Sequence, residues 1–438
     1  MRKLLIFLVV FIAITYVNTA FSQGKKAQLD SLFKILEKEN QAMGSIAILK
    51  KGKVFYQNAF GYKNLEKKIP AQPNTLYRIG SITKTYTATM IMQLVEDNKL
   101  DLDQKLAAFY PKVKNADSIS IDMLLRHRSG IFNFTNEEDY LKRAEKPTSK
   151  QDILNRIYNY ESLFKPDNKF GYSNTNYMLL TFIIEDVTGN SYQEVLKENI
   201  LKPLDLSSTF YKFPDTPTLS YVPANPWKKE MSTDVSVPRG AGAIIASATD
   251  VALFFNALFK GQLVNKENLR QMKSIEGQYG IGLFQIPFYE LKGYGHTGGI
   301  DGFRSNAAYF ESEELSIAYL SNGANYPLND IMIKSLSIYF EKDFEYPDFS
   351  VNYNHSPQEL QALTGTYSTP QFPLKIKISY EDGQLKGQAT GQPEFTLRAV
   401  EKNLFEFKPV NLKMNFQPKK KSLTLIQNGQ NINFNKTE

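Results

Sequence analysis

Apolar and polar positions follow two different periods along the chain, and the order of these periods predicts its elements. Residues 28–36 carry apolar side chains at helical spacing, and residues 44–62 contain two β-rich runs joined by the turn sequence KKGK. A helix is predicted over residues 81–98. Its apolar residues spread over more than one face, which is typical of a buried helix.

The middle of the chain, residues 100–270, is mostly helical in pattern and has long loops. Helices are predicted over residues 174–190 and 247–261, each ending at or next to a glycine, a common C-terminal signal. β-rich segments return between residues 279 and 322, and a last helix is predicted over residues 328–340.

This order of strands, helices, strands and helix predicts an α+β fold. Strands from both ends of the main domain, residues 23–345, are expected to share one antiparallel sheet with flanking helices and an all-helical insertion between them. Residues 346–358 are polar and aromatic without a period, as in a linker. Residues 359–438 alternate apolar and polar positions between turns, which predicts a small antiparallel β domain, a barrel or a sandwich, of about six or more strands.

Residues 1–22 have the pattern of an export signal. A basic end is followed by an apolar run over residues 4–17, and a small-x-small cleavage site ends at Ser22. The apolar run is shorter than the ~20 residues that span a bilayer, which disfavours an uncleaved anchor. We expect an exported protein, periplasmic or secreted, whose mature chain begins at Gln23 and has no integral membrane segment.

Composition excludes several other classes of protein. The net charge of +7 is spread thinly, and its densest run, Lys419–Lys421, is typical of a solvated turn, so no nucleic-acid partner is expected. The chain has no cysteine, which removes disulfides, thiolate metal sites and cysteine nucleophiles. Its three histidines lack metal-ligand spacing, so neither a metal nor a cofactor is expected.

The first motif with candidate chemistry is Ser81-Ile82-Thr83-Lys84. A serine and a lysine three residues apart in a helix lie on the same face, where the amine can accept the proton of the hydroxyl. The alternative is that Ser81 only caps a helix, since this spacing is common. Its position at the start of an apolar helix, directly after a strand-like run, favours the catalytic interpretation.

A second motif, Tyr172-Ser173-Asn174, lies in a loop before a predicted helix. A phenol near a lysine ammonium is expected to have a depressed pKa and to act as a general base. The amide of Asn174 offers an acceptor and donors for a substrate amide or for the lysine. The alternative is an asparagine cap beside a packed tyrosine.

The third motif lies in GYGHTGGIDG, residues 293–302. Its G-x-G-x-x-G spacing matches a dinucleotide-binding loop, but a turn and a strand follow instead of the helix that such a loop requires. The glycines fit close approach of a ligand to an edge strand. The segment then offers His296-Thr297-Gly298 as a candidate substrate-binding edge.

The order of the three motifs, S-x-x-K, Y-x-N and H-T-G, resembles the serine β-lactamase and penicillin-binding protein family, specifically its class C β-lactamases, DD-carboxypeptidases and related esterases. The resemblance covers residues 28–340 and includes KLDLDQKLAAFYP, MLLRHRSGI and PRGAGAIIASATDVALFF. It implies that residues 23–345 form a serine hydrolase domain.

The resemblance also implies roles for individual residues. Ser81 matches the acylated nucleophile, Lys84 its proton-transfer partner and Tyr172 the tyrosine implicated as general base. The substrate would be bound by Asn174, His296, Thr297 and Gly298, and the oxyanion hole would be the backbone N–H groups of Ser81 and Gly299. His127 falls in a family motif that implies packing rather than catalysis.

The histidine at position 296 departs from the β-lactamases, which usually carry lysine there. A neutral histidine contributes hydrogen bonds rather than a permanent charge for a substrate carboxylate. We therefore expect a hydrolase acting on peptides or amides that contain D-residues, such as cell-wall stem peptides, in the manner of a DD-carboxypeptidase or D-aminopeptidase. The alternatives are a carboxylesterase or class C-like β-lactamase with the same site, and a non-catalytic penicillin-binding-like protein.

Overall fold

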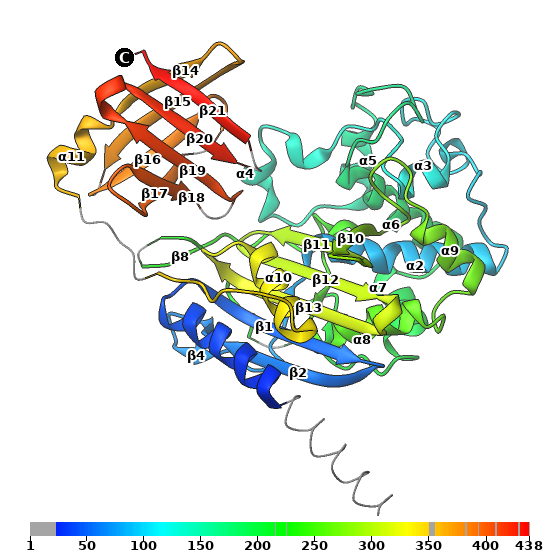
Figure 1. The fold of residues 1–438 in the computed structure, drawn as a ribbon. Helices are drawn as coiled ribbons and strands as arrows, with labels where there is room; N and C mark the ends of the chain where they lie inside the picture. Colours follow the sequence, from blue (N-terminus) through cyan, green and yellow to red (C-terminus); the bar gives the residue numbers. More distant parts are fainter. Residues whose placement is uncertain are drawn as a thin grey trace, which may run out of the picture. The chain divides into compact units, whose positions relative to one another are not determined.

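The computed structural model describes residues 23–437 apart from 215, 225, 350–354, 382, 393, 408–409 and 428–429. The predicted export signal therefore lies outside the described residues. The chain forms two compact units (Figure 1). One comprises the described residues up to Glu37 with Ala42–Ala324, and the other comprises Lys38–Gln41 with the chain from Asn325 onwards. This division falls earlier than the expected domain boundary at residues 345 and 346.

The first unit is built on a six-stranded antiparallel sheet in the order β10-β11-β12-β13-β1-β2. Strand β1 pairs with β13 along its length, so the two ends of this unit share one sheet, as the sequence predicted. The bounds of the strands are β1 Ala42–Lys50, β2 Lys53–Phe60, β10 Phe284–Phe288, β11 Leu291–Ile300, β12 Phe303–Phe310 and β13 Leu315–Ala324.

Short strands connect this sheet to the insertion. Strand β5 pairs with β9 in a small sheet with β6, directly before the first motif. The bounds are β3 Tyr62–Asn64, β4 Ile69–Pro70, β5 Tyr77–Arg78, β6 Thr209–Phe210, β7 Tyr221–Val222, β8 Lys228–Lys229 and β9 Ile245–Ala246.

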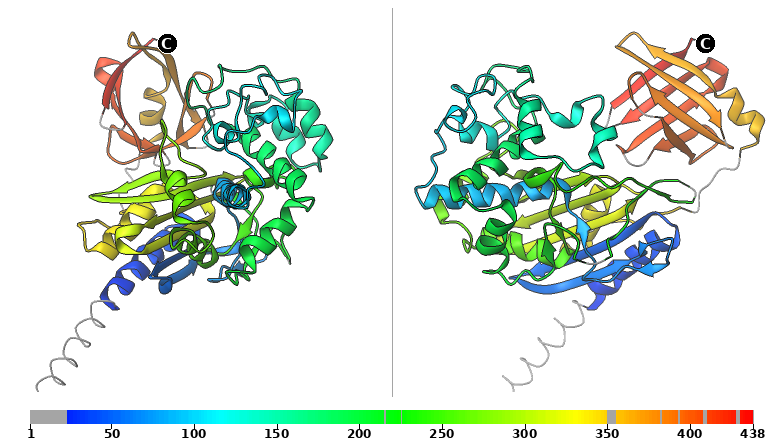
Figure 2. Two further views of the ribbon diagram at one scale, coloured as in Figure 1. Left: turned by 90° about the vertical axis from the view of Figure 1, so that its right-hand side faces the viewer. Right: turned by 180° about the vertical axis from the view of Figure 1, so that it is seen from behind.

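The helices of the first unit include the predicted insertion, which gathers beside the sheet (cyan to green in Figure 2). Helix α2 is buried on nearly all sides, as its apolar pattern predicted, and α8 contacts β1, β12 and β13. Besides a helix over residues 23–38, the bounds are α2 Thr83–Glu96, α3 Ile121–Leu125, α4 Tyr140–Ala144, α5 Lys150–Ile157, α6 Asn174–Thr188, α7 Tyr192–Leu196, α8 Ala248–Phe259 and α9 Lys266–Lys273. Shorter turns are η1 Gly80–Ile82, η2 Leu106–Ala108, η3 Phe134–Asn136, η4 Lys197–Leu201, η5 Arg239–Ala241 and η6 Glu311–Glu313.

The second unit contains a closed antiparallel barrel, β14 to β21. The β domain predicted beyond residue 359 is thus confirmed, and of the two expected forms it is a barrel. Alternate residues face its apolar interior, as in β19, where Leu412, Met414 and Phe416 are buried. The bounds are α10 Leu328–Phe340, α11 Pro357–Ala362, β14 Gly365–Thr369, β15 Phe372–Glu381, β16 Gln384–Ala389, β17 Phe395–Ala399, β18 Leu404–Phe407, β19 Leu412–Gln417, η8 Pro418–Lys420, β20 Ser422–Gln427 and β21 Gln430–Lys436.

Candidate active site

Ser81 lies in a tight turn between strand β5 and helix α2. The turn η1 comes first and α2 begins at Thr83, two residues later than predicted. Gly80 has a φ of +51°, and a Cβ atom placed on it would lie 2.7 Å from the backbone nitrogen of Gly299. A side chain at position 80 would therefore collide with β11, so glycine allows the turn of Ser81 to approach that strand.

Lys84 is fully buried directly below Ser81. Its Nζ lies 3.0 Å from Ser81 Oγ, 2.7 Å from Asn174 Oδ1 and 2.7 Å from the carbonyl oxygen of Ala241. Burial holds the pKa of Lys84 well below its usual value. A neutral amine has two N–H groups and one lone pair. The two N–H groups can donate hydrogen bonds to Asn174 Oδ1 and to the carbonyl oxygen of Ala241. That lone pair is then left for the hydroxyl proton of Ser81.

Tyr172 contacts the other side of Ser81. Its hydroxyl forms a hydrogen bond with Ser81, and its ring lies 4.9 Å from Lys84 Nζ. Burial raises the pKa of Tyr172, so the expected depressed pKa is wrong in direction. The reason is that the lysine lies over the ring and is itself desolvated, while the buried site disfavours a phenolate. As a phenol, Tyr172 can donate a hydrogen bond to Ser81 Oγ when the serine proton faces Lys84.

Asn174 is the first residue of α6 and links three segments. Its Oδ1 accepts from Lys84, its Nδ2 lies 3.3 Å from Thr135 Oγ1, and its backbone N–H donates to Asn133 Oδ1 at 3.0 Å. These bonds hold the amide beside Lys84 and the serine.

His127 packs behind Tyr172, as its family motif implied. Its ring is fully buried and its centroid lies 4.2 Å from that of Tyr172. Nδ1 accepts a hydrogen bond from the backbone N–H of Ser173 at 3.2 Å. This contact anchors the loop that carries Tyr172.

His296 in the third motif is also buried, and both of its ring nitrogens have protein partners. Nδ1 lies 2.5 Å from the carbonyl oxygen of Thr297, and Nε2 lies 2.8 Å from Tyr279 Oη. A carbonyl can only accept, so Nδ1 carries the proton and Nε2 accepts from the tyrosine. Burial, with a smaller contribution from Lys84, lowers the pKa of His296 to about 3. The ring is therefore neutral, and direct contact of His296 with a substrate stays a prediction.

Sequence reasoning did not identify Tyr279 as part of the site. It falls in a stretch that was predicted as strand, but β10 begins only at Phe284. The ring of Tyr279 packs near those of His127 and His296. Nothing in the local pattern signals this contact, since the hydroxyl reaches a residue on another element.

Gly298 and Gly299 bring the backbone of β11 to the serine. A Cβ atom on Gly298 would lie 2.1 Å from the carbonyl oxygen of Ile79 and 3.0 Å from the backbone nitrogen of Ser81. Residue pairs in an antiparallel ladder alternate between hydrogen-bonded and non-hydrogen-bonded pairs. Ile300 and Phe303 close a two-residue turn and form a hydrogen-bonded pair, so the next pair, Gly299 and Arg304, is not hydrogen-bonded. Gly299 thus falls on a non-bonded pair, and its N–H points away from β12. This places it to serve the predicted oxyanion hole with Ser81.

A cavity of about 530 Å³ opens beside these groups. Of the predicted residues, Ser81, Asn174 and Gly299 line it, whereas Lys84 and Tyr172 contact Ser81 from beneath. Thr297 is exposed on β11 but does not line this cavity. The structure therefore brings Ser81, Asn174 and Gly299 to one wall of a space that is large enough for a small substrate, with Lys84 bonded to Ser81 behind that wall.

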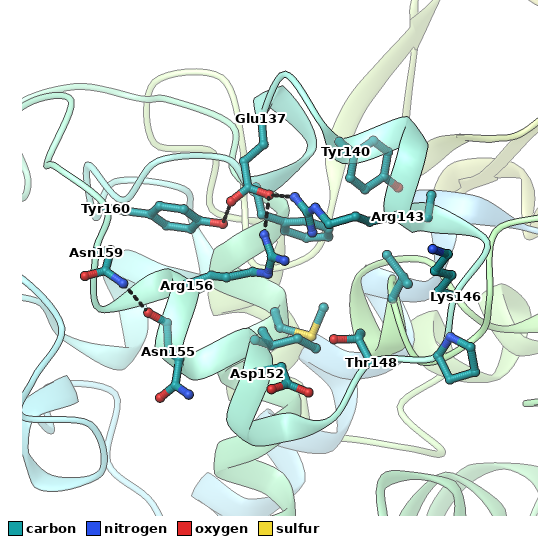
Figure 3. Close-up of a pocket in the computed structure, with 16 residues that line it drawn as sticks. Glu137, Tyr140, Arg143, Lys146, Thr148, Asp152, Asn155, Arg156, Asn159 and Tyr160 are labelled. Atoms are coloured by element: carbon teal, nitrogen blue, oxygen red, sulfur yellow. Dashed lines mark hydrogen bonds and ion pairs between the residues drawn. The ribbon is translucent and has the colours of Figure 1, made fainter.

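A second cavity, of about 480 Å³, shares Phe134 and Tyr140 with the first (Figure 3). Its acidic residue Glu137 already has partners: it pairs with Arg143, and its carboxylate accepts a hydrogen bond from Tyr160 Oη at 2.7 Å. None of the predicted catalytic residues lines it.

Two features of the described residues bear on other kinds of site. In that part of the chain no helix combines the length and the hydropathy needed to cross a membrane. The same residues contain no group of three or more His, Cys, Asp or Glu side chains arranged to hold a metal ion.

The fold and the arrangement around Ser81 define a serine hydrolase with a serine–lysine pair. The family model described as Beta-lactamase matches residues 30–333, so the chain belongs to the β-lactamase family. Protein flp of Staphylococcus aureus (strain N315) is 34% identical over 200 residues, 44% of this chain and 40% of that protein, so the match spans less than half of that relative. The putative penicillin-binding protein PbpX of Bacillus subtilis (strain 168) is 28% identical over 66% of this chain and 72% of its own.

Solved structures show the same fold. A D-stereospecific amidohydrolase from Streptomyces sp. is 26% identical, with a TM-score of 0.59 over 68% of this chain and 94% of its own. The octameric penicillin-binding protein homologue from Pyrococcus abyssi is 24% identical, with a TM-score of 0.67 over 93% of this chain and 99% of its own. The D-amino acid amidase from Ochrobactrum anthropi SV3 is 23% identical, with a TM-score of 0.64 over 74% and 99%.

Proposed function

We propose that the protein is an exported hydrolase that cleaves amide bonds of D-amino-acid-containing peptides or amides through an acyl-enzyme on Ser81. The observation that carries the chemistry is the buried amine of Lys84, which lies 3.0 Å from Ser81 Oγ and donates to two carbonyl oxygens, Asn174 Oδ1 and that of Ala241. The D-residue specificity is supported by likeness to a solved amidohydrolase that is named D-stereospecific. Export is supported by the signal pattern of residues 1–22.

Acylation begins when Ser81 Oγ attacks the carbonyl carbon of the substrate and its proton passes to the neutral Nζ of Lys84. The oxygen of the tetrahedral intermediate becomes negative between the backbone N–H groups of Ser81 and Gly299. Because Tyr172 remains a phenol, it can donate its proton to the leaving nitrogen and recover one from Lys84. The C–N bond then breaks, leaving an ester on Ser81 and a free amine.

Deacylation uses the same groups with water in place of the amine. Water attacks the ester carbon and loses a proton to the amine of Lys84, while the oxyanion is held as before. Ser81 Oγ leaves and regains its proton from Lys84, which restores the resting enzyme. Asn174 keeps Lys84 in place through the 2.7 Å bond to its Oδ1.

A panel of substrates tests this proposal. Purified protein is offered an acetylated D-alanyl-D-alanine, D-alanine amide, the L-alanine counterparts, a short-chain ester and a cephalosporin, beside Ser81→Ala. We expect hydrolysis of at least one D-substrate, a preference of at least about tenfold over its L-counterpart, and no turnover by Ser81→Ala. Acylation of Ser81 is read by mass spectrometry after acid quenching.

The outcomes separate the alternatives. Hydrolysis of the ester alone would reassign the enzyme as a carboxylesterase, and rapid cephalosporin hydrolysis would make it a β-lactamase. A stable acyl-enzyme without turnover on any member of the panel would indicate a penicillin-binding-like protein.

A further inference from the structure

One cationic side chain faces the cavity beside Ser81. Among the described residues that line this cavity, Arg304 alone carries a positive charge, and Glu230 and Asp301 carry the negative ones. The histidine of the third motif contributes no charge there, because its ring is buried and neutral. Any electrostatic recognition of an anionic substrate group in this cavity therefore depends on Arg304.

Arg304 lies next to the expected oxyanion donor. It is opposite Gly299 in the register of β11 and β12. A Cβ atom built on Gly299 would lie 3.7 Å from Cδ and Nη1 of Arg304 and 3.9 Å from its Cζ. The guanidinium thus covers the space left by the absent side chain of Gly299. A group bound to it would lie beside the backbone of Gly299, the expected oxyanion donor.

The nearest carboxylate is already engaged elsewhere. Asp301 forms a buried ion pair with Arg78 at 2.8 Å and accepts from Thr233 Oγ1 at 2.5 Å. Its side chain is 2% exposed and that of Arg78 3%. Asp301 thus forms its ion pair with Arg78, while Arg304 bonds only to the backbone carbonyl of Asp301. Burial lowers the pKa of Arg304, and the charges of Asp301 and, less strongly, of Glu230 still act on Arg304 and partly oppose that lowering.

The guanidinium of Arg304 is held through Nη1, which leaves the edge formed by Nε and Nη2 for a ligand. Nη1 donates to the carbonyl oxygens of Asp301 and Phe303 at 2.9 and 2.8 Å. Nε and Nη2 form the fork that binds a carboxylate with two parallel hydrogen bonds. No carboxylate of the described residues forms an ion pair with Arg304. Glu230, on the same cavity, accepts a hydrogen bond from the backbone N–H of Met231 at 2.9 Å and acts on Arg304 only through its charge.

We propose that Arg304 binds a carboxylate of the substrate through this free edge, so that the enzyme prefers substrates with an anionic group near the scissile bond. This inference rests on the proposed function. The carboxylate has two sources: the terminal carboxylate of the leaving residue, as in a carboxypeptidase substrate, or a carboxylate on the acyl part. Arg304 is then a specificity-determining residue that touches the substrate, whereas Lys84 and Tyr172 move the proton.

Two matched substrate pairs distinguish the sources. The first is acetyl-D-alanyl-D-alanine and its C-terminal amide, and the second is succinyl- and propionyl-D-alanine amide. In the wild-type protein we expect kcat/KM of the acid to exceed that of its neutral partner by about 10- to 100-fold in one pair. In Arg304→Gln the ratio should fall to about one. Arg304→Lys, which keeps the charge but loses the fork, should retain part of the preference.

Glu230→Gln is the matched control, because it removes a charge of opposite sign from the same cavity. It should keep the preference for the acid. A wild-type ratio near one in both pairs, or an unchanged ratio in Arg304→Gln, would overturn the role of Arg304. Thermal unfolding of each variant confirms that the substitutions at these exposed or half-buried positions leave the fold intact.

A binding measurement separates this inference from the proposed function. Calorimetric titration of Ser81→Ala and of Ser81→Ala/Arg304→Gln with the same four compounds needs no turnover. If no compound is hydrolysed by the wild type, the proposed function fails. A 10- to 100-fold tighter Kd for one acid, lost in the double variant, would still support the anion site. Equal Kd values for acid and amide would overturn it.

Discussion

Helix α2, which carries Lys84, and strand β11, which carries His296, each bury a basic side chain near Ser81. In both, burial lowers the pKa of the base. They differ in where the lone pair of the neutral base points. The amine of Lys84 donates to two carbonyl oxygens, and its third contact is the hydroxyl of Ser81, toward which the lone pair then points. In His296 the lone pair of Nε2 already accepts the hydroxyl of Tyr279.

This difference assigns the two bases different roles. A base that faces a nucleophile can accept its proton, whereas a base whose nitrogens are both bonded to the protein holds a strand in position. Proximity to the serine and a shifted pKa are thus insufficient to identify a catalytic base. The hydrogen-bond partners of each nitrogen distinguish Lys84 from His296, and substitutions can test this distinction.

The largest expected effect is at Lys84. Lys84→Met keeps the length of the side chain but replaces the basic amine with a non-basic thioether, so kcat should fall by about 10³-fold, within the usual range for loss of a general base. The matched variant His296→Gln should lower kcat by no more than about tenfold, because it changes the packing of β11 rather than the proton acceptor. Steady-state kinetics on the best substrate of the panel compare the two. Equal losses in kcat would break the distinction between the two bases.

Tyr172 contacts the other side of Ser81, and its role as a proton donor can be tested beside that of Lys84 as a proton acceptor. Its raised pKa predicts that it acts as a phenol, a donor to Ser81 Oγ and to the leaving nitrogen. Tyr172→Phe keeps the ring over Lys84 and removes the hydroxyl, so kcat should fall by about 10- to 100-fold on amide substrates.

Esters provide the control for Tyr172, because an alkoxide or phenolate leaving group needs less protonation than an amine. The loss should therefore be smaller for a p-nitrophenyl ester than for an amide. The same loss on both substrates would assign Tyr172 to activation of the serine instead.

Much of the fold could be predicted from the sequence, because the determining signals are local. The helix at residues 328–340 has the predicted bounds, and α6 begins at the predicted Asn174 and ends before Gly189, whose φ of +70° favours glycine. The sharing of one sheet by β1 and β13 followed from the order of the elements. The closure of the C-terminal β domain into a barrel could not be predicted in the same way, because it depends on the pairing of β14 with β21, which are far apart in the sequence.

The site was predictable to the extent that its motifs are local. Ser81 and Lys84 lie one turn apart on the chain, and the family order placed Asn174 beside them. The direction of the pKa shift of Tyr172, the partner of His296 and the charge of Arg304 in the cavity were not predictable. Each depends on burial or on contacts between separate elements, which periodicity does not encode.

The smallest expected effect concerns the pH dependence of stability. An ordinary histidine has a pKa near 6.5, whereas that of folded His296 is about 3, so the unfolded chain binds more protons between these values. The free energy of unfolding should therefore fall as the pH is lowered below about 6.5. From pH 7 to pH 5 the contribution of His296 to this loss is about 2 kcal/mol. Urea unfolding of His296→Gln should show a pH dependence smaller by that amount.

Tyr279→Phe keeps the imidazole but removes the hydroxyl that donates to Nε2. At pH 7 it should lower the free energy of unfolding by about 1 kcal/mol, since a buried acceptor loses its partner. Its pH dependence should remain close to that of the wild type, because the ring is still buried beside Lys84. If His296→Gln and the wild type instead lost stability equally between pH 7 and pH 5, folded His296 would have the ordinary pKa of a histidine and would be protonated at pH 5. The strand would then carry a charge near Ser81, and the contrast with Lys84 would no longer hold.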